Sequence, residues 1–93
     1  MAFAMMFDVP GGTQQQYDQS AELLRRRGVT LPVAGQLLHL VGPSEGGWRT
    51  IDVWESQEAA DRFFQEHLAA IFAEIGMTTD VQPQVFPIHA LYK

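Results

Sequence analysis

The chain has 93 residues, the length of one domain and too short for two, so we expect a single domain over residues 1–93. Its composition, 46% hydrophobic and 18% charged with no biased tract, predicts a globular rather than a disordered protein. The net charge is −5, and three of the six basic residues are consecutive at 25–27. Nucleic acid is therefore not an expected partner, since a phosphate-binding face needs basic residues spread over it.

The chain has no cysteine, which excludes disulfides and thiolate metal sites. No apolar run approaches the roughly 18 residues that a membrane-spanning helix needs, so no membrane partner is expected. The apolar stretch 1–7 is short and lacks a basic leader, and it predicts a strand rather than a secretion signal. We therefore expect a cytoplasmic protein.

The first half of the chain reads as a strand followed by a helix. The strand covers Phe3–Asp8 and is closed by residues 10–12, Pro-Gly-Gly. Thr13 begins the helix, and Gln16 three residues later completes the pattern of a capping box. Gly28, directly after the three arginines, ends the helix.

The second half predicts a hairpin and a second helix. Gln36–Val41 and Trp48–Glu55 are strands joined by a Gly-rich turn over residues 42–47. Ser56 caps the helix, which runs to Gly76. Its apolar residues recur at helical spacing: Ala59, Phe63, Phe64, Leu68, Ile71, Phe72 and Ile75.

Val85–Tyr92 is predicted to be the last strand, and Pro87 within it suits an edge or a bulge. The element order is then βαββαβ. We expect an α+β, ferredoxin-like fold, with a four-stranded antiparallel sheet and two helices on one of its faces.

The strands are apolar on both sides, although two helices can cover only one face of such a sheet. In the third strand Ile51 and Val53 point to one side, with Trp48 and Trp54 on the other. The economical cover for the second face is a copy of the same sheet across a two-fold axis, which predicts a homodimer. The alternative is that a few apolar side chains are singly exposed, as is common in monomers.

Residues 46–56, Gly-Gly-Trp-Arg-Thr-Ile-Asp-Val-Trp-Glu-Ser, resemble the dimeric α/β barrel superfamily. The resemblance continues through the Phe63-Phe64 helix, with His39 on the strand before and Pro87-Ile88-His89 on the strand after. The chain is most similar to small actinobacterial-type members that have no assigned activity. The resemblance implies a homodimeric barrel with a pocket between sheet and helices or toward the barrel.

Other branches of that superfamily include cofactor-free monooxygenases of aromatic polyketides, polyketide cyclases, haem-degrading enzymes and muconolactone isomerase-like proteins. No catalytic set of any branch matches this chain residue by residue. The resemblance therefore implies a fold and assigns no reaction.

His39 interrupts an apolar strand and is the leading candidate for chemistry. If the hairpin pairs about the Ser44–Glu45 turn, His39 lies opposite Thr50 and Leu37 opposite Asp52. A one-residue slip would separate His39 from these side chains. The favoured register gathers on one face the candidate catalytic residues His39 and Asp52 and the candidate substrate-binding residues Trp48, Thr50 and Trp54.

A carboxylate bonded to one imidazole nitrogen fixes the tautomer and raises the basicity of the other nitrogen. His39, oriented by Asp52, would then be a general base for a phenol or for a carbon beside a carbonyl. Such chemistry needs no cofactor and no bound metal. The alternative is a satisfied core histidine with Asp52 as its hydrogen-bond partner.

Four further side chains have two readings each. Trp48 and Trp54 would stack on a flat aromatic ligand or pack the dimer core. Tyr17 would supply a hydroxyl to the pocket or simply pack, and His89 would reach the same cavity or the dimer interface. His67 is expected in solvent, and since the three histidines lack metal-ligand spacing, no metal site is expected.

The sequence thus favours a cofactor-independent enzyme, of monooxygenase, cyclase or isomerase type, acting on a hydrophobic aromatic or polyketide-like small molecule. The alternative is a non-catalytic dimer that binds a small ligand or serves as a scaffold. A haem role is a third option, because an axial histidine is available, but nothing else that such a site requires is present.

Overall fold

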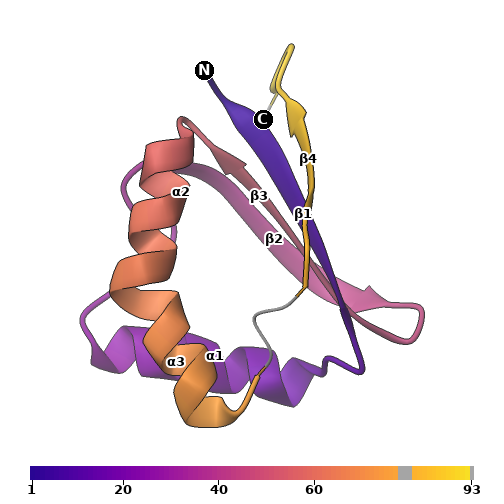
Figure 1. Cartoon of the computed structure of the whole chain (residues 1–93), viewed down its shortest axis with the longest axis vertical. Helices are drawn as coiled ribbons and strands as arrows, with labels where there is room; N and C mark the ends of the chain where they lie inside the picture. The colour runs from indigo at the N-terminus through magenta and orange to yellow at the C-terminus, as the bar shows by residue number, and fades with distance from the viewer. Residues whose placement is uncertain (78–80, 93) are drawn as a thin grey trace.

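The computed structural model describes residues 1–77 and 81–92, and its elements follow the predicted βαββαβ order (Figure 1). Every pairing in the single sheet is antiparallel, and the strand order is β2-β3-β1-β4. The strands are β1 (Phe3–Pro10), β2 (Gln36–Ser44), β3 (Gly47–Trp54) and β4 (Gln84–Pro87).

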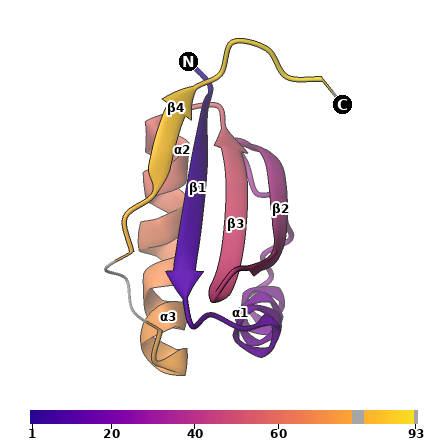
Figure 2. The same cartoon turned by 90° about the vertical axis from the view of Figure 1, so that its right-hand side faces the viewer.

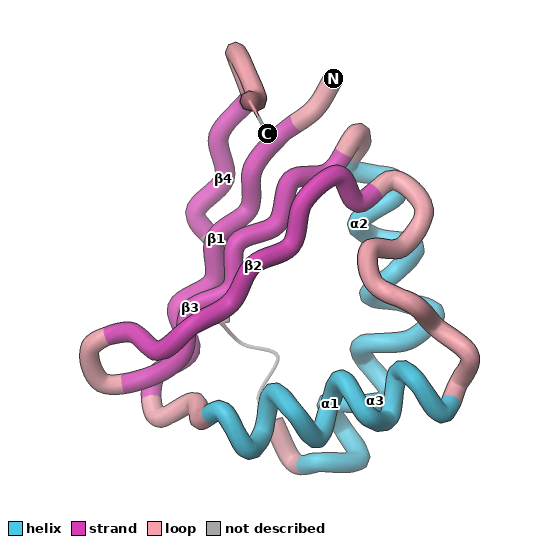
Figure 3. The backbone as a smooth tube through the Cα atoms, turned by 180° about the vertical axis from the view of Figure 1, so that it is seen from behind, coloured by secondary structure: helices cyan, strands magenta, loops and turns pink. Residues whose placement is uncertain are grey.

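The helices lie on one face of this sheet, as predicted (Figure 2). Helix α1 covers Gln14–Arg26. The second helical run consists of α2 (Gln57–Phe63), a π-helical turn (Phe64–Leu68) and α3 (Ala69–Ile75). Figure 3 shows α1 running crosswise to this second run. Within the described ranges, no helix is long and apolar enough to span a membrane.

The helix boundaries follow the predicted signals. The Thr13 hydroxyl accepts a hydrogen bond from the Gln16 backbone N–H at 3.1 Å, and the Gln16 side chain accepts one from the Thr13 N–H at 3.2 Å. The Ser56 hydroxyl accepts from the Ala59 N–H at 3.1 Å. Gly76 ends α3 with φ +73°, a conformation that side chains other than glycine rarely adopt.

The hairpin is tighter than the expected turn over residues 42–47. β2 continues to Ser44, which pairs with Gly47, so that only Glu45 and Gly46 form the turn. Pro43 is tolerated inside β2 because this strand lies at the sheet edge, where a missing N–H breaks no ladder. A Cβ at Gly47 would collide with the backbone oxygen of Val9, so the neighbouring strand requires glycine there.

The predicted last strand, Val85–Tyr92, is wrong in its extent. Only Gln84–Pro87 forms β4, which pairs with the start of β1. Phe3 is the first residue of β1 and its partner is Pro87, so the residues after Pro87 have no strand beside them. One further hydrogen bond, from the Ile88 N–H to the Ala2 carbonyl at 3.0 Å, ends the contact.

The π-helical turn over 64–68 was not predicted from the apolar spacing, because one extra residue in a helix leaves the surrounding pattern nearly intact. The core lies where the helical run meets the sheet. Its buried members are Phe3, Leu24, Trp54, Ala59, Ala60, Phe63 and Ile71.

We expect Ile71→Ala to lower the free energy of unfolding by about 2–5 kcal/mol, because Ile71 is 1% exposed and its truncation leaves a cavity. Urea denaturation would measure the loss. Glu74→Ala, at an exposed position of the same helix, is the control and should change the value by less than about 0.5 kcal/mol. Equal effects of the two substitutions would contradict this placement of the core.

Candidate functional site

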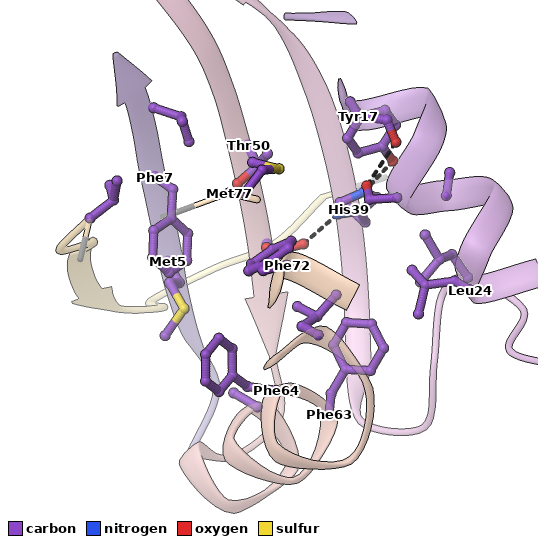
Figure 4. A pocket seen from close by; sticks show the side chains of 18 of the residues that line it. Met5, Phe7, Tyr17, Leu24, His39, Thr50, Phe63, Phe64, Phe72 and Met77 are labelled. Atoms are coloured by element: carbon purple, nitrogen blue, oxygen red, sulfur yellow. Dashed lines mark hydrogen bonds and ion pairs between the residues drawn. The ribbon is translucent and has the colours of Figure 1, made fainter. Parts of the chain in front are cut away.

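A cavity of about 330 Å³ lies between the helices and the sheet (Figure 4). Its volume is at the small end of the roughly 300–1,000 Å³ typical of small-molecule sites. Most of its wall is apolar, contributed by β1, β3, α1 and the helical run that contains the π turn. The apolar lining residues include Met5, Phe7, Leu24, Trp48, Trp54, Phe63, Phe64, Leu68, Phe72 and Met77.

The residues predicted to face the cavity lie together, but the β2–β3 hairpin pairs in a different register from the predicted one. His39 pairs with Asp52 and Val41 with Thr50, whereas the sequence prediction placed His39 opposite Thr50. The pairing is displaced because the turn is centred on Glu45–Gly46. A displacement by two residues keeps each side chain on its face of the sheet. The five residues expected on one face therefore all line the cavity: His39, Trp48, Thr50, Asp52 and Trp54.

The imidazole of His39 is bonded to the Asp52 carboxylate. The distance from His39 Nδ1 to Asp52 Oδ1 is 2.5 Å, and the two side chains are 19% and 13% exposed. Gln36 Nε2 donates to the same Oδ1 at 2.9 Å, while Gln36 Oε1 accepts from the Val33 backbone N–H at 3.1 Å. Because the Val33 N–H can only donate, the Gln36 amide is oriented with its NH₂ toward Asp52.

These contacts determine the tautomer of His39. The Asp52 carboxylate is an acceptor, so the neutral imidazole carries its proton on Nδ1 and presents the Nε2 lone pair. The Tyr17 hydroxyl lies 2.8 Å from Nε2 and donates to it (Figure 4). Tyr17, His39, Asp52 and Gln36 thus form one hydrogen-bond network, which we call the Tyr17–Gln36 network.

The sequence singled out Tyr17 but not its bond to His39, and it missed Gln36. Tyr17 sits in the first turns of α1, whose start is fixed by the Thr13 cap. Gln36 is buried at the start of β2, where the pairing is irregular between Gln36 and Leu38. A buried glutamine at a strand end was the available signal, since such an amide needs polar partners.

The environment of Tyr17 keeps its phenol neutral. Burial raises the pKa of Tyr17 above its ordinary value of 10, and the negative charges of Asp52 and then Asp18 raise this pKa further. The phenolic proton is therefore retained at neutral pH and is available for donation to His39.

Both tryptophans face the helices, so the reading that places them in the dimer core is wrong. Strand alternation puts them on the same side of β3 as Asp52. The Trp48 ring lies 5.8 Å from that of Tyr17, and the buried Trp54 ring 5.8 Å from that of Phe63. The Trp48 indole N–H is buried and has no hydrogen-bond partner among the described residues.

The other two histidines lie apart from the network. His89 is exposed and, contrary to the reading that places it in the cavity, does not line it, because β4 ends at Pro87. His67 is half-buried rather than in solvent, with its ring 6.0 Å from that of Phe63. Over residues 1–77 and 81–92, no group of three or more His, Asp or Glu side chains is placed to hold a metal ion.

The charged side chains in the described part of the cavity wall are all acidic. Asp52 and Asp61 line the cavity, and no Lys or Arg does so in the described part of the chain. The network therefore offers a proton acceptor and hydrogen-bond donors to a ligand, but no cationic side chain.

Comparisons with solved structures support the fold. A proposed antibiotic biosynthesis monooxygenase from Chloroflexus aurantiacus is 13% identical with a TM-score of 0.68, over 100% of this chain and 98% of that chain. A conserved protein from Methanosarcina mazei is 12% identical with a TM-score of 0.63, over 94% and 92%. A proposed antibiotic biosynthesis monooxygenase from Deinococcus radiodurans is 14% identical with a TM-score of 0.52, over 100% and 97%.

No protein-family model and no curated protein matches the chain. The ferredoxin-like fold is shared with the solved structures, and identities this low show the fold alone.

We expect Tyr17 to ionise at higher pH than a free tyrosine, because its pKa is raised. The measurement is the tyrosinate absorbance of Tyr92→Phe against pH, since Tyr17 is the only tyrosine left in that variant. The free energy of unfolding should fall as pH rises above about 10, since the unfolded chain loses the Tyr17 proton first. Asp52→Asn should lower the Tyr17 pKa without restoring it fully, because burial is the larger cause.

The double variant Tyr17→Phe and Tyr92→Phe has no tyrosine and is the control for this titration, in which the absorbance change should disappear. A Tyr17 that ionises at the ordinary pKa of a free tyrosine would contradict the buried, bonded position of its hydroxyl.

Proposed function

We propose that the protein is a cofactor-independent enzyme that removes a proton from a hydrophobic, aromatic or polyketide-like small molecule. One observation carries the proposal: the His39–Asp52 pair is held in the wall of a mostly apolar cavity of ligand size. His39 is the base, and Asp52 positions it and stabilises the imidazolium that forms.

The cavity suits the anion that such a step leaves. Aromatic walls such as Trp48 and Phe72 accept a flat ring system, and they keep water from the anion. An electron-rich anion of this kind can cyclise, isomerise or react with molecular oxygen. Two of the structural relatives are proposed monooxygenases, and for this reason oxygen consumption is the first reaction to test.

The alternative is a non-catalytic protein that binds a small ligand or serves as a scaffold. One observation favours it: both ring nitrogens of His39 already have partners, as in a satisfied core histidine. The two functions differ in what His39 does when a ligand is present, so substitution of His39 separates them.

We expect His39→Gln to reduce turnover about 10²–10⁴-fold, the usual contribution of a general base. The wild-type protein is first screened against hydroxylated naphthalenes and anthrones, by oxygen consumption and by mass spectrometry of the products. His89→Gln is the control, because His89 is exposed and outside the cavity. Full turnover by His39→Gln would reject His39 as the base, and ligand binding without turnover by the wild type would favour the alternative.

We also propose that the protein works as a homodimer through the face of the sheet opposite the helices (Figure 2). The register places Leu40, Ile51 and Met6 in one row on that face, with Leu40 47% exposed. Phe86 lies in the next row and is 57% exposed. An apolar surface of this kind is typical of an interface between copies.

Leu40→Glu should convert the dimer into a monomer, because the two-fold axis would bring two carboxylates into an apolar contact. Light scattering coupled to size exclusion would measure the mass. Gln19→Glu, which adds the same charge at an exposed position of α1, should leave the mass unchanged. A wild-type protein that is monomeric at micromolar concentration would refute the dimer.

A further inference from the structure

We propose that Tyr17 is the residue that takes the proton of the substrate and passes its own proton to His39, and that the substrate is a neutral phenol or enol. This inference rests on the proposed function and names the group through which the base acts. It also gives the chemical class of the ligand.

The position of Tyr17 is the first argument. His39 Nδ1 is committed to Asp52, and Nε2, the remaining nitrogen, is covered by the Tyr17 hydroxyl at 2.8 Å. The two rings are stacked, with centroids 6.0 Å apart and planes inclined by 23°. A substrate proton therefore meets the oxygen of Tyr17 before it can meet His39.

The proton count closes without any other reactant. The substrate O–H gives its proton to the Tyr17 oxygen, and the Tyr17 O–H gives its own proton to His39 Nε2. His39 becomes an imidazolium beside the Asp52 carboxylate, Tyr17 is again a neutral phenol, and the substrate becomes an oxyanion. The proton stays within the complex of protein and substrate, so the net charge of that complex does not change.

The resting state has each proton on the side that this relay requires. The orientation of Gln36 makes Asp52 an acceptor, which places the imidazole proton on Nδ1 and leaves Nε2 to receive. The raised pKa of Tyr17 agrees, since it keeps the phenol protonated before a ligand arrives. A substrate phenol with an ordinary pKa is a stronger acid than Tyr17, whose pKa is raised, so replacing the Tyr17 proton by the substrate proton is favourable in free energy.

The charge of the wall selects a neutral ligand. Asp52 and Asp61 line the cavity, and within the described ranges none of the lining residues is Lys or Arg. A carboxylate or phosphate ligand would meet like charge and find no counter-ion in a low-dielectric site. The aromatic walls and the volume of about 330 Å³ fit a flat molecule of two or three fused rings.

The test uses 1-naphthol, a flat two-ring phenol that is neutral at pH 7 and whose near-ultraviolet absorption shows whether it is ionised. The probe is titrated with pH in the presence of the wild-type protein, Tyr17→Phe, His39→Gln and Tyr92→Phe. We expect wild type and Tyr92→Phe to lower the ionisation midpoint of the bound probe by about one pH unit, a tenfold change in its acid dissociation. Tyr17→Phe and His39→Gln should still bind the probe, but without this change.

Three outcomes would overturn the inference. If Tyr17→Phe still ionises the probe as the wild type does, His39 takes the proton of the probe directly. If Tyr17→Phe lost binding of the probe and of naphthalene, which has no hydroxyl, to the same degree, Tyr17 would be only a packing residue. Binding of 1-naphthoate as tight as that of the probe would contradict a neutral ligand class, for which we expect the carboxylate to bind at least about tenfold more weakly.

The failure of the relay differs from the failure of the proposed function. If ionisation of the probe or turnover of a substrate requires His39 but not Tyr17, the relay is rejected and His39 remains the base. Wild-type protein that binds the probe without any change in its ionisation would overturn the relay, and unaltered turnover in His39→Gln would count against the proposed function itself.

Discussion

The hydrogen bond between Asp52 and His39 is the interaction on which the candidate site depends. A carboxylate in this position can only accept, so it fixes where the imidazole proton lies and which nitrogen remains free. Gln36 prevents the carboxylate from turning away, because its amide is held in turn by the backbone of Val33. The direction of every proton in the network follows from these two restraints.

The fold brings this network together from elements that are far apart in the sequence. β2 and β3 set His39 beside Asp52 through strand pairing alone. Tyr17 comes from α1, whose first residue is determined by the Thr13 capping box, so that a local signal places a side chain in a long-range contact. The helices lie on one side of the sheet and cross one another (Figure 3). The cavity has lining residues from both the helices and the sheet, and His39 and Asp52 are among them.

Much of the fold was predictable because its signals are local. The caps at Thr13 and Ser56, the stop at Gly76 and the apolar helix spacing all act within a few residues. The hairpin register was displaced because the number of residues in a Gly-rich turn is not determined by its composition. The end of β4 depends on where β1 begins, a long-range property that no local pattern around Pro87 contains.

The candidate site was predicted in its members but not in its connections. Alternation on β3 is a period-two property, and it survived a register error of two residues, so His39 and Asp52 were correctly placed on one face with Trp48 and Trp54. The contact from Tyr17 to His39 depends on the angle at which α1 crosses the sheet, which is set by packing.

The π-helical turn has a consequence for how the cavity wall can vary. One residue of an α-helix corresponds to about 100° of rotation, so the extra residue within Phe64–Leu68 sets the helical phase of everything that follows. A regular α-helix over the same residues, without the wide turn, would rotate Phe72 by about 100° from its present direction, while the sheet and the Tyr17–Gln36 network stay where they are. The shape of the ligand space and its acid–base chemistry are therefore encoded in separate parts of the chain, and one could change without the other.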